Sequence, residues 1–266
     1  MDETKIEFSA LMKGLVRDGE VFRANVHEGW LQGRTLYGGL LAAYCLQSAS
    51  AAFPDVPPLR SAQLAFVGPS SKMVALHPSM LRRGRSTAFV GVDSQGDDGI
   101  SARATFCYGA ARQASRAGVQ VVAPIVPPPS DCEPFPLTIP GLNFPRNFER
   151  RSAGGNAPFS KSSNMTTAIW LKHRDDAAPD TMASLVALAD AALPAAMAFF
   201  DSYKPLSTMT WSLDVLTDRI ANGAGWWLVE VQAESLRDGY SSQKMTVWNA
   251  EGEAVLCCRQ HVAVFA

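Results

Sequence analysis

The feature of the sequence that most constrains the fold is an internal repeat. The stretch 61–70 (SAQLAFVGPS) resembles 210–219 (TWSLDVLTDR), and 80–106 resembles 235–261. In the second pair, 155 residues separate Leu81 from Leu236 and also separate Gly84 from Gly239. Similarity at a fixed spacing is typical of a duplicated structural unit. The repeat therefore predicts two copies of one unit in a single chain.

Each copy begins with an apolar helix and continues into strands. Residues 40–53 and 181–200 are rich in helix formers and apolar on nearly all faces, which predicts two buried helices. Asp180 is the expected N-cap of the second helix, and Pro194 its kink or end. Alternating apolar residues and turn signals follow in each copy. The predicted fold class is α+β, with each helix wrapped by an antiparallel sheet.

A proline-rich segment separates the copies. Eight of the chain's 17 prolines lie between Pro124 and Pro145, a density that excludes helix and sheet interiors. We therefore predict an N-terminal unit over 1–123, a connector over 124–148 and a C-terminal unit over 149–266. The apolar residues among the prolines predict that the connector packs along the protein surface.

Composition narrows the possible partners and location. The net charge is −1, from 24 basic and 25 acidic residues, and no basic run indicates a nucleic acid partner. The first 15 residues lack the pattern of a signal peptide, and no apolar stretch has the length of a membrane span. The five cysteines have no metal-ligand spacing. We predict a cytoplasmic protein with neither a metal nor another cofactor.

The two copies differ in polar residues. Asp214 stands where the first copy has Ala65, Ser235 replaces Met80, and Gln260 lies at about Cys107. This predicts that the second copy holds a reaction site and that the first copy is scaffold.

Strand alternation indicates which of these side chains point inward. Ser235 continues the apolar face of Trp227, Val229, Val231 and Ala233, and Gln260 shares a face with Leu256, Cys258, Val262 and Val264. The inward assignment of Asp214 rests on the repeat alone. An inward carboxylate, hydroxyl and amide suit the activation of a water for attack on a carbonyl. The alternative is structural: Ser235 ends a strand, Gln260 satisfies a backbone group and Asp214 caps a turn.

Several ordered motifs resemble a known family. They are the Gly-Gly-helix at 38–53, Arg-Arg-Gly-Arg-Ser at 82–86, Ser-Leu-Asp at 212–214 and Gln260 near the C-terminus. Together they resemble the acyl-CoA thioesterase II (TesB-like) family, and the likeness runs from about Val21 to Phe265 outside the connector. The resemblance implies a double hotdog fold and hydrolysis of an acyl-CoA to free acid and CoA. The chain departs from the family at Val215 and His261, where the family usually has His and Glu.

The resemblance also implies roles for individual residues. An Asp, a Ser or Thr, and a Gln hold the reacting water in the family, and they match Asp214, Ser235 and Gln260. Gly38 and Gly39 are candidates for binding the oxyanion through backbone N–H groups, although the same glycines could merely start the helix. Asp190 is a second acid to weigh, because the family also has an Asp inside this helix; its alternative is a structural partner.

Two other functions stay open. Hotdog hydratases and dehydratases use a His together with an acid on the active helix or its entry loop, and neither predicted helix contains a His. A protein that binds acyl-CoA or lipid without hydrolysis is the other alternative. The exposed edge strands of a double hotdog predict a homodimer or homotetramer.

Overall fold

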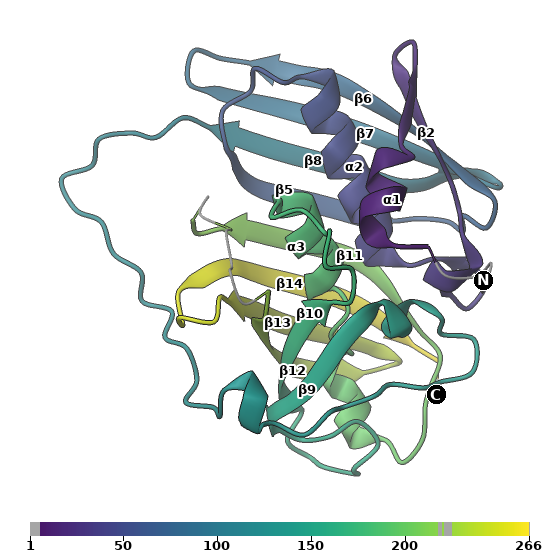
Figure 1. The fold of residues 1–266 in the computed structure, drawn as a ribbon, viewed down its shortest axis with the longest axis vertical. Coiled ribbons are helices and arrows are strands. Elements are labelled where there is room, and N and C mark those ends of the chain that lie inside the picture. Colours follow the sequence, from purple (N-terminus) through teal and green to yellow (C-terminus); the bar gives the residue numbers. More distant parts are fainter. Residues whose placement is uncertain (1–5, 218–219, 221–224, 266) are drawn as a thin grey trace.

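One continuous antiparallel sheet runs through the whole molecule. The computed structural model describes residues 6–217, 220 and 225–265. Twelve strands follow the order β1-β2-β6-β7-β8-β5-β11-β14-β13-β12-β10-β9 (Figure 1). The strands of the first repeat and those of the second meet where β5 pairs with β11. The duplicated units are therefore joined by backbone hydrogen bonds as well as by packing.

The elements have the following bounds. The first half contains β1 (Val16–Asp18), β2 (Val21–Asn25), β5 (Leu59–Phe66), β6 (Met73–Arg83), β7 (Thr87–Gly96) and β8 (Gly99–Gly109), together with the separate hairpin of β3 (Leu31–Gln32) and β4 (Thr35–Leu36). The second half contains β9 (Phe148–Gly155), β10 (Thr166–His173), β11 (Leu206–Val215), β12 (Trp227–Arg237), β13 (Tyr240–Trp248) and β14 (Ala254–Val264). The α-helices are α1 (Phe8–Lys13), α2 (Gly38–Ala52) and α3 (Met182–Ala189).

Helices α2 and α3 lie side by side within the curve of the sheet (Figure 1). Their apolar side chains belong to one core, which also includes inward residues of both sheet halves. The predicted α+β arrangement of two buried helices wrapped by antiparallel strands is therefore confirmed.

The second helix is shorter than predicted. It ends at Ala189, not at Phe200, and its N-cap is Thr181, whose Oγ1 accepts from the Ser184 N–H at 3.3 Å, not Asp180. Pro194 lacks the N–H that would continue the helix, and proline also disfavours helical geometry at the residue before it. The chain instead turns after Asp190 and forms a short 3₁₀ helix over Ala195–Phe199.

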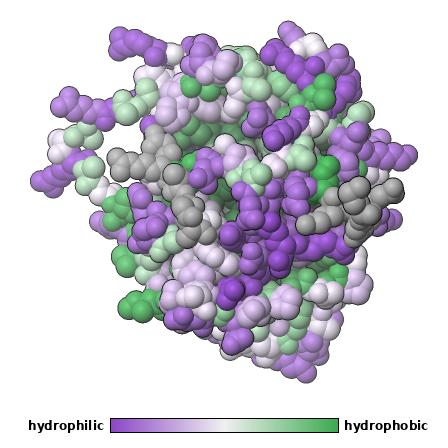
Figure 2. Space-filling view, viewed as in Figure 1, coloured by the Kyte–Doolittle hydropathy of each residue, from purple (hydrophilic) through white to green (hydrophobic). Residues whose placement is uncertain are grey.

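An exposed segment lies between β8 and the predicted connector. Residues 110–122 are exposed and stand away from the body at the left of Figure 1, where Figure 2 shows both hydrophilic and hydrophobic residues. The connector itself packs on the sheet, because the Trp170 indole N–H donates to the Pro127 carbonyl at 2.9 Å. The Phe135 N–H also donates to the Arg150 carbonyl on β9 at 2.8 Å. The unit boundaries at 123 and 148 stay a prediction, and residues 1–5 and 266 lie outside the described residues.

A glycine sets how closely the two helices approach. A Cβ atom at Gly39 would lie 2.6 Å from the Tyr37 hydroxyl and 2.8 Å from the Ala187 carbonyl oxygen on α3. The Tyr37 hydroxyl cannot easily move away, since it donates to that same carbonyl at 2.8 Å and its ring stacks on Phe144 at 4.0 Å. Only glycine fits at this position without moving one helix against the other.

We expect Gly39→Ala to lower the free energy of unfolding by about 1–3 kcal/mol, the usual cost of overpacking a buried contact. Urea unfolding followed by circular dichroism measures this change. Gly118→Ala is the matched control, because a Cβ there meets nothing within 4 Å, and its effect should stay within about 0.5 kcal/mol. Equal stability of both variants would contradict the close helix contact.

Candidate active site

Asp190 lies where α3 ends, in front of the start of α2. Its Oδ1 accepts a hydrogen bond from Gln260 Nε2 at 2.7 Å. A Cβ at Gly38 would lie 3.2 Å from its Oδ2, and the Gly39 backbone N–H donates to the carboxylate. One carboxylate is therefore contacted by residues from both halves of the chain.

The surroundings of Asp190 change its acidity. Burial disfavours the charged form and raises the pKa of this carboxyl to about 7. The hydrogen bonds from Gln260 and from the Gly39 N–H oppose the shift, because both stabilise the anion. A carboxyl group with a pKa near neutrality can accept a proton from water and later return it.

A chain of buried amides fixes the orientation of Gln260. Gln243 Nε2 donates to Gln260 Oε1 at 2.6 Å, and the Ala195 N–H donates to Gln243 Oε1 at 3.3 Å. Gln243 is fully buried and Gln260 is 4% exposed. Because Gln260 Oε1 is occupied, its NH₂ group must face Asp190. The predicted inward position of Gln260 is confirmed.

Thr208 lies in the same cavity as Asp190 and Gln260. It lines a small cavity with Asp190 and Gln260, and a larger cavity of about 550 Å³ with Asp190 and Gly38. A bulge between Thr208 and Thr210 pairs Thr208 with the fully buried Val262, which turns Thr208 toward the inner face. A carboxylate, an amide and a hydroxyl therefore share one cavity wall.

The predicted inward position of Asp214 is wrong. Asp214 is exposed, and on β11 it alternates with the buried Leu213 and Val215. It pairs with Cys257, whereas Gln260 pairs with Trp211, three residues earlier on β11. An odd separation along a strand places two side chains on opposite faces of the sheet. Asp214 therefore does not meet Gln260.

The predicted inward position of Ser235 is also wrong. A bulge interrupts β12 between Ala233 and Ser235, so the alternation that holds up to Ala233 changes phase. Ser235 pairs with Ser242 and is exposed, while the neighbouring Gln243 points inward. The predicted trio of Asp214, Ser235 and Gln260 is therefore not brought together, and only Gln260 lies in the cavity.

The structure adds Thr208 and Gln243 to the residues found by sequence. Gln243 had a readable signal, since it lies two and four residues before the inward Met245 and Val247 and therefore shares their face of β13. Thr208 had none, because its orientation depends on a bulge. Gly38 and Gly39 lie beside Asp190, and their role as oxyanion donors stays a prediction.

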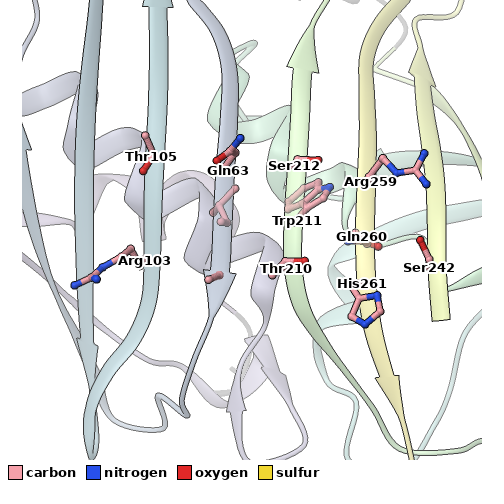
Figure 3. Close-up of a pocket in the computed structure, with 12 residues that line it drawn as sticks. Gln63, Arg103, Thr105, Thr210, Trp211, Ser212, Ser242, Arg259, Gln260 and His261 are labelled. Carbon is pink, nitrogen blue, oxygen red and sulfur yellow. The ribbon is translucent and has the colours of Figure 1, made fainter. Parts of the chain in front are cut away.

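A second hollow, of about 470 Å³, lies on the outer face of the sheet over β8, β5, β11 and β14 (Figure 3). Its two guanidinium groups are already paired: Arg103 binds Asp93 at 2.6 Å, and Arg259 binds Glu234. Figure 3 shows Arg259 and His261 on either side of Gln260 along β14, and both are exposed whereas Gln260 is buried. The hydrogen bond from Arg103 lowers the pKa of Asp93 on this face, which is the opposite of the shift at Asp190.

Within the described part of the chain, His, Cys, Asp and Glu side chains do not gather in any group of three that could hold a metal ion. Among the same residues, every helix is too short or too polar to cross a membrane.

Comparison with known proteins identifies the family. A model described as the acyl-CoA thioesterase N-terminal domain matches residues 26–109, and one described as the acyl-CoA thioesterase C-terminal domain matches residues 129–264. The chain belongs to the acyl-CoA thioesterase family, as its motifs predicted. A search of proteins with curated function finds no match.

Solved structures show the same fold. A hot dog fold protein of unknown function from Alicyclobacillus acidocaldarius is 24% identical, with 96% of this chain and 97% of that chain covered and a TM-score of 0.87. The tesB protein of Mycobacterium avium subsp. paratuberculosis is 19% identical over 97% and 98%, with a TM-score of 0.78. The acyl-CoA thioesterase II TesB2 of Mycobacterium marinum is 17% identical over 95% and 96%, with a TM-score of 0.72. The double hotdog fold is confirmed.

The raised pKa of Asp190 predicts a pH-dependent stability. In the unfolded chain the carboxyl ionises near pH 4, and in the folded protein near pH 7. Between these values the folded state holds the extra proton, so stability falls as the pH rises from about 4 to about 7. Asp190→Asn removes this loss, which amounts to as much as about 4 kcal/mol.

The measurement is urea unfolding of wild type and Asp190→Asn from pH 4 to 8. We expect the stability of the variant relative to wild type to increase up to about pH 7 and then to level off. A difference that does not change with pH would show that Asp190 ionises normally.

Proposed function

We propose that this protein hydrolyses acyl-CoA thioesters by water activation at Asp190. The observation that carries the proposal is the bond from Gln260 to a carboxylate whose pKa is raised to about 7, at the start of a buried helix. The matches to acyl-CoA thioesterase domains over both halves support the same chemistry. Free acid and CoA are the products.

In the proposed mechanism Asp190 acts as general base. Its carboxylate takes a proton from water while the water oxygen bonds to the thioester carbonyl carbon. The C–S bond then breaks, and the protonated Asp190 returns the proton to the departing sulfur. Gln260 and Thr208 orient the carboxylate and the water, and Gln243 fixes Gln260. No side chain becomes acylated.

The start of α2 is the proposed oxyanion site. Backbone N–H groups at a helix N-terminus have no partner within the helix, and the helix dipole favours negative charge there. Gly38 and Gly39 carry no side chain that would block a carbonyl oxygen from approaching. The Gly39 N–H donates to Asp190 in the absence of substrate, so a bound carbonyl would share or replace this contact.

The cavity of about 550 Å³ is the proposed place for the acyl group. Its walls include apolar side chains beside the carboxylate, among them Leu36, Leu41, Phe66 and Leu206. A cavity of this size and character suits a small apolar group with a few polar contacts at one place. The hydroxyl of Thr208 and the carboxylate of Asp190 supply those contacts.

The test is thiol release from acyl-CoAs of graded chain length. We expect Asp190→Asn to reduce kcat by about 10²–10⁴-fold, the usual contribution of a general base. Asp214→Asn is the matched variant, since its carboxylate lies on the outer face, and it should keep activity near wild type. Loss of activity in Asp214→Asn with retention in Asp190→Asn would overturn the assignment.

The hydrogen bond from Gln260 predicts a shift of the pH profile. We expect kcat/KM of the wild type to rise with pH through a midpoint near 7, where Asp190 ionises. Gln260→Ala removes a bond that lowers the Asp190 pKa, so its midpoint should move to higher pH. An unchanged midpoint would show that Asp190 does not control the rate.

The alternatives predict other outcomes of the same assays. A binding protein would retain acyl-CoA without releasing thiol. A hydratase or dehydratase would add or remove water across a carbon–carbon double bond and leave the thioester intact. Neither α2 nor α3 contains a histidine, which favours hydrolysis over the second alternative.

Assembly as a homodimer or homotetramer and a cytoplasmic location stay predictions. The outermost strands of the sheet are β1 and β9. The connector already bonds to β9 through Phe135 and Glu133, so β1, which has three residues, is the edge that a second copy would extend. Light scattering after gel filtration tests the assembly.

A further inference from the structure

Arginines concentrate at one corner of the first half, far from Asp190. Arg82, Arg83 and Arg85 lie on the β6–β7 hairpin, Arg60 lies on β5, and Arg112 follows β8. The hairpin and the end of β8 are adjacent, since Thr87 pairs with Gly109. They lie together at the upper left of Figure 1, where Figure 2 shows hydrophilic residues. The 15 residues of α2 separate this corner from Gly38, roughly 20 Å at 1.5 Å per residue.

Neutral acceptors hold two of these guanidinium groups. Arg60 Nε donates to the Gly109 carbonyl at 2.8 Å, and an Arg112 terminal nitrogen donates to Ser86 Oγ at 3.3 Å. A carbonyl or hydroxyl partner fixes a guanidinium without neutralising its charge, and most of its five N–H donors stay available. Arg60 and Arg112 are therefore positioned cations with spare donors.

Few carboxylates balance this charge. Arg83 pairs with Asp55 at 2.7 Å. Among the described residues, Arg60, Arg82, Arg85 and Arg112 form no ion pair. The outer-face arginines differ, because both Arg103 and Arg259 have carboxylate partners. Among the described residues, four of the five arginines at this corner therefore carry a charge that no ion pair balances.

The equivalent hairpin of the second copy, between β12 and β13, forms without three arginines. Residues 236–241 read Leu-Arg-Asp-Gly-Tyr-Ser, where 81–86 read Leu-Arg-Arg-Gly-Arg-Ser. The second copy closes its turn with Asp238 and Gly239, both at positive φ, and has one arginine at this place. The additional arginines of the first copy thus call for a reason other than closing the turn.

A cavity of about 450 Å³ opens between these cations. Its lining includes Arg60, Arg112, Thr87 and the backbone of Gly109. Phe89 pairs with Cys107, another lining residue, and is 37% exposed, so an aromatic ring lies beside the cavity. Guanidinium groups match the geometry of phosphate oxygens, and an exposed ring suits stacking by a base.

We propose that this cavity binds the phosphate group of a nucleotide-type ligand, with Arg60 and Arg112 as its principal contacts. Arg82 and Arg85 raise the local positive potential that attracts the anion. The site is separate from Asp190, and its occupancy does not depend on thioester hydrolysis. The phosphate could belong to the nucleotide part of CoA or to a free nucleotide, and the chemistry that binds it is the same.

The test is isothermal titration of the full chain at low salt with adenosine 3′,5′-bisphosphate, CoA and inorganic phosphate. We expect the bisphosphate to bind, and the double variant Arg60→Met/Arg112→Met to weaken binding at least tenfold. Arg237→Met is the matched control, because it occupies the position of Arg82 in the second copy, is highly exposed and lies beside Asp238. Its affinity should stay within twofold of wild type.

Additional variants and ligands in the same titration distinguish the possible results. Asp190→Asn should bind the bisphosphate as wild type does, which distinguishes this cavity from the proposed catalytic one. If the double variant fails to fold, the single variant Arg112→Met takes its place. Arg112 is exposed, and this variant should weaken binding about threefold or more. Tighter binding of CoA than of the bisphosphate would assign the phosphate to a CoA molecule, and weaker binding of CoA would assign it to a free nucleotide; equal binding would support the site and show that only the nucleotide part is contacted. Absence of binding by wild type, or unchanged binding by the double variant, would overturn the proposal.

Discussion

The contact between α2 and α3 is the constraint on which the site depends. Gly39 lets the start of α2 reach the last turn of α3, where the Tyr37 hydroxyl bonds to the Ala187 carbonyl. This contact brings the open N–H groups of one helix to the carboxylate that follows the other. A side chain at position 39 would separate the two halves of the candidate site. Both helices belong to one core with the sheet, so such a separation would also disturb the packing around them.

The buried amides beside Asp190 are joined by one connected chain of hydrogen bonds. The Ala195 N–H, Gln243, Gln260 and Asp190 follow one another, and each amide uses its oxygen and its nitrogen in a defined direction. A buried amide without a partner would cost about 1–3 kcal/mol, so the chain stabilises the fold while it orients the carboxylate. The arrangement also explains why the pKa of Asp190 rises only to about 7: burial raises it, and the terminal amide and the Gly39 N–H oppose the rise.

Duplication left the two halves with different chemistry. The second half provides Asp190, Thr208 and Gln260 to the inner cavity, whereas the first half provides the helix start. In the sheet, Phe106 pairs with Ala62 in the first copy as Gln260 pairs with Trp211 in the second. The apolar ring of Phe106 thus occupies the place in the first copy that the Gln260 amide occupies in the second. The first half instead has the arginine-rich hairpin, which the second half lacks.

The sequence by itself determined the duplication, the two buried helices, the antiparallel strands and the inward position of Gln260. These follow from the repeat, from apolar periodicity and from regular alternation along β14, all of which are local. The phase of β11 and β12 could not be predicted, because bulges between Thr208 and Thr210 and between Ala233 and Ser235 shift alternation by one residue. The second bulge is why Ser235 was expected inside and lies outside. Asp214 was expected inside only because the repeat aligns it with Ala65, although it alternates with the inward Leu213 and Val215 on β11.

Only the tertiary structure decided which acid meets the amide. Asp190 and Gln260 are 70 residues apart in the chain, and the helix that presents Asp190 ends earlier than its apolar run indicates. The contact depends on how α3 packs against α2 and on how β14 curves around both helices. Such a contact arises from the packing of distant segments, which a one-dimensional pattern of residues does not encode.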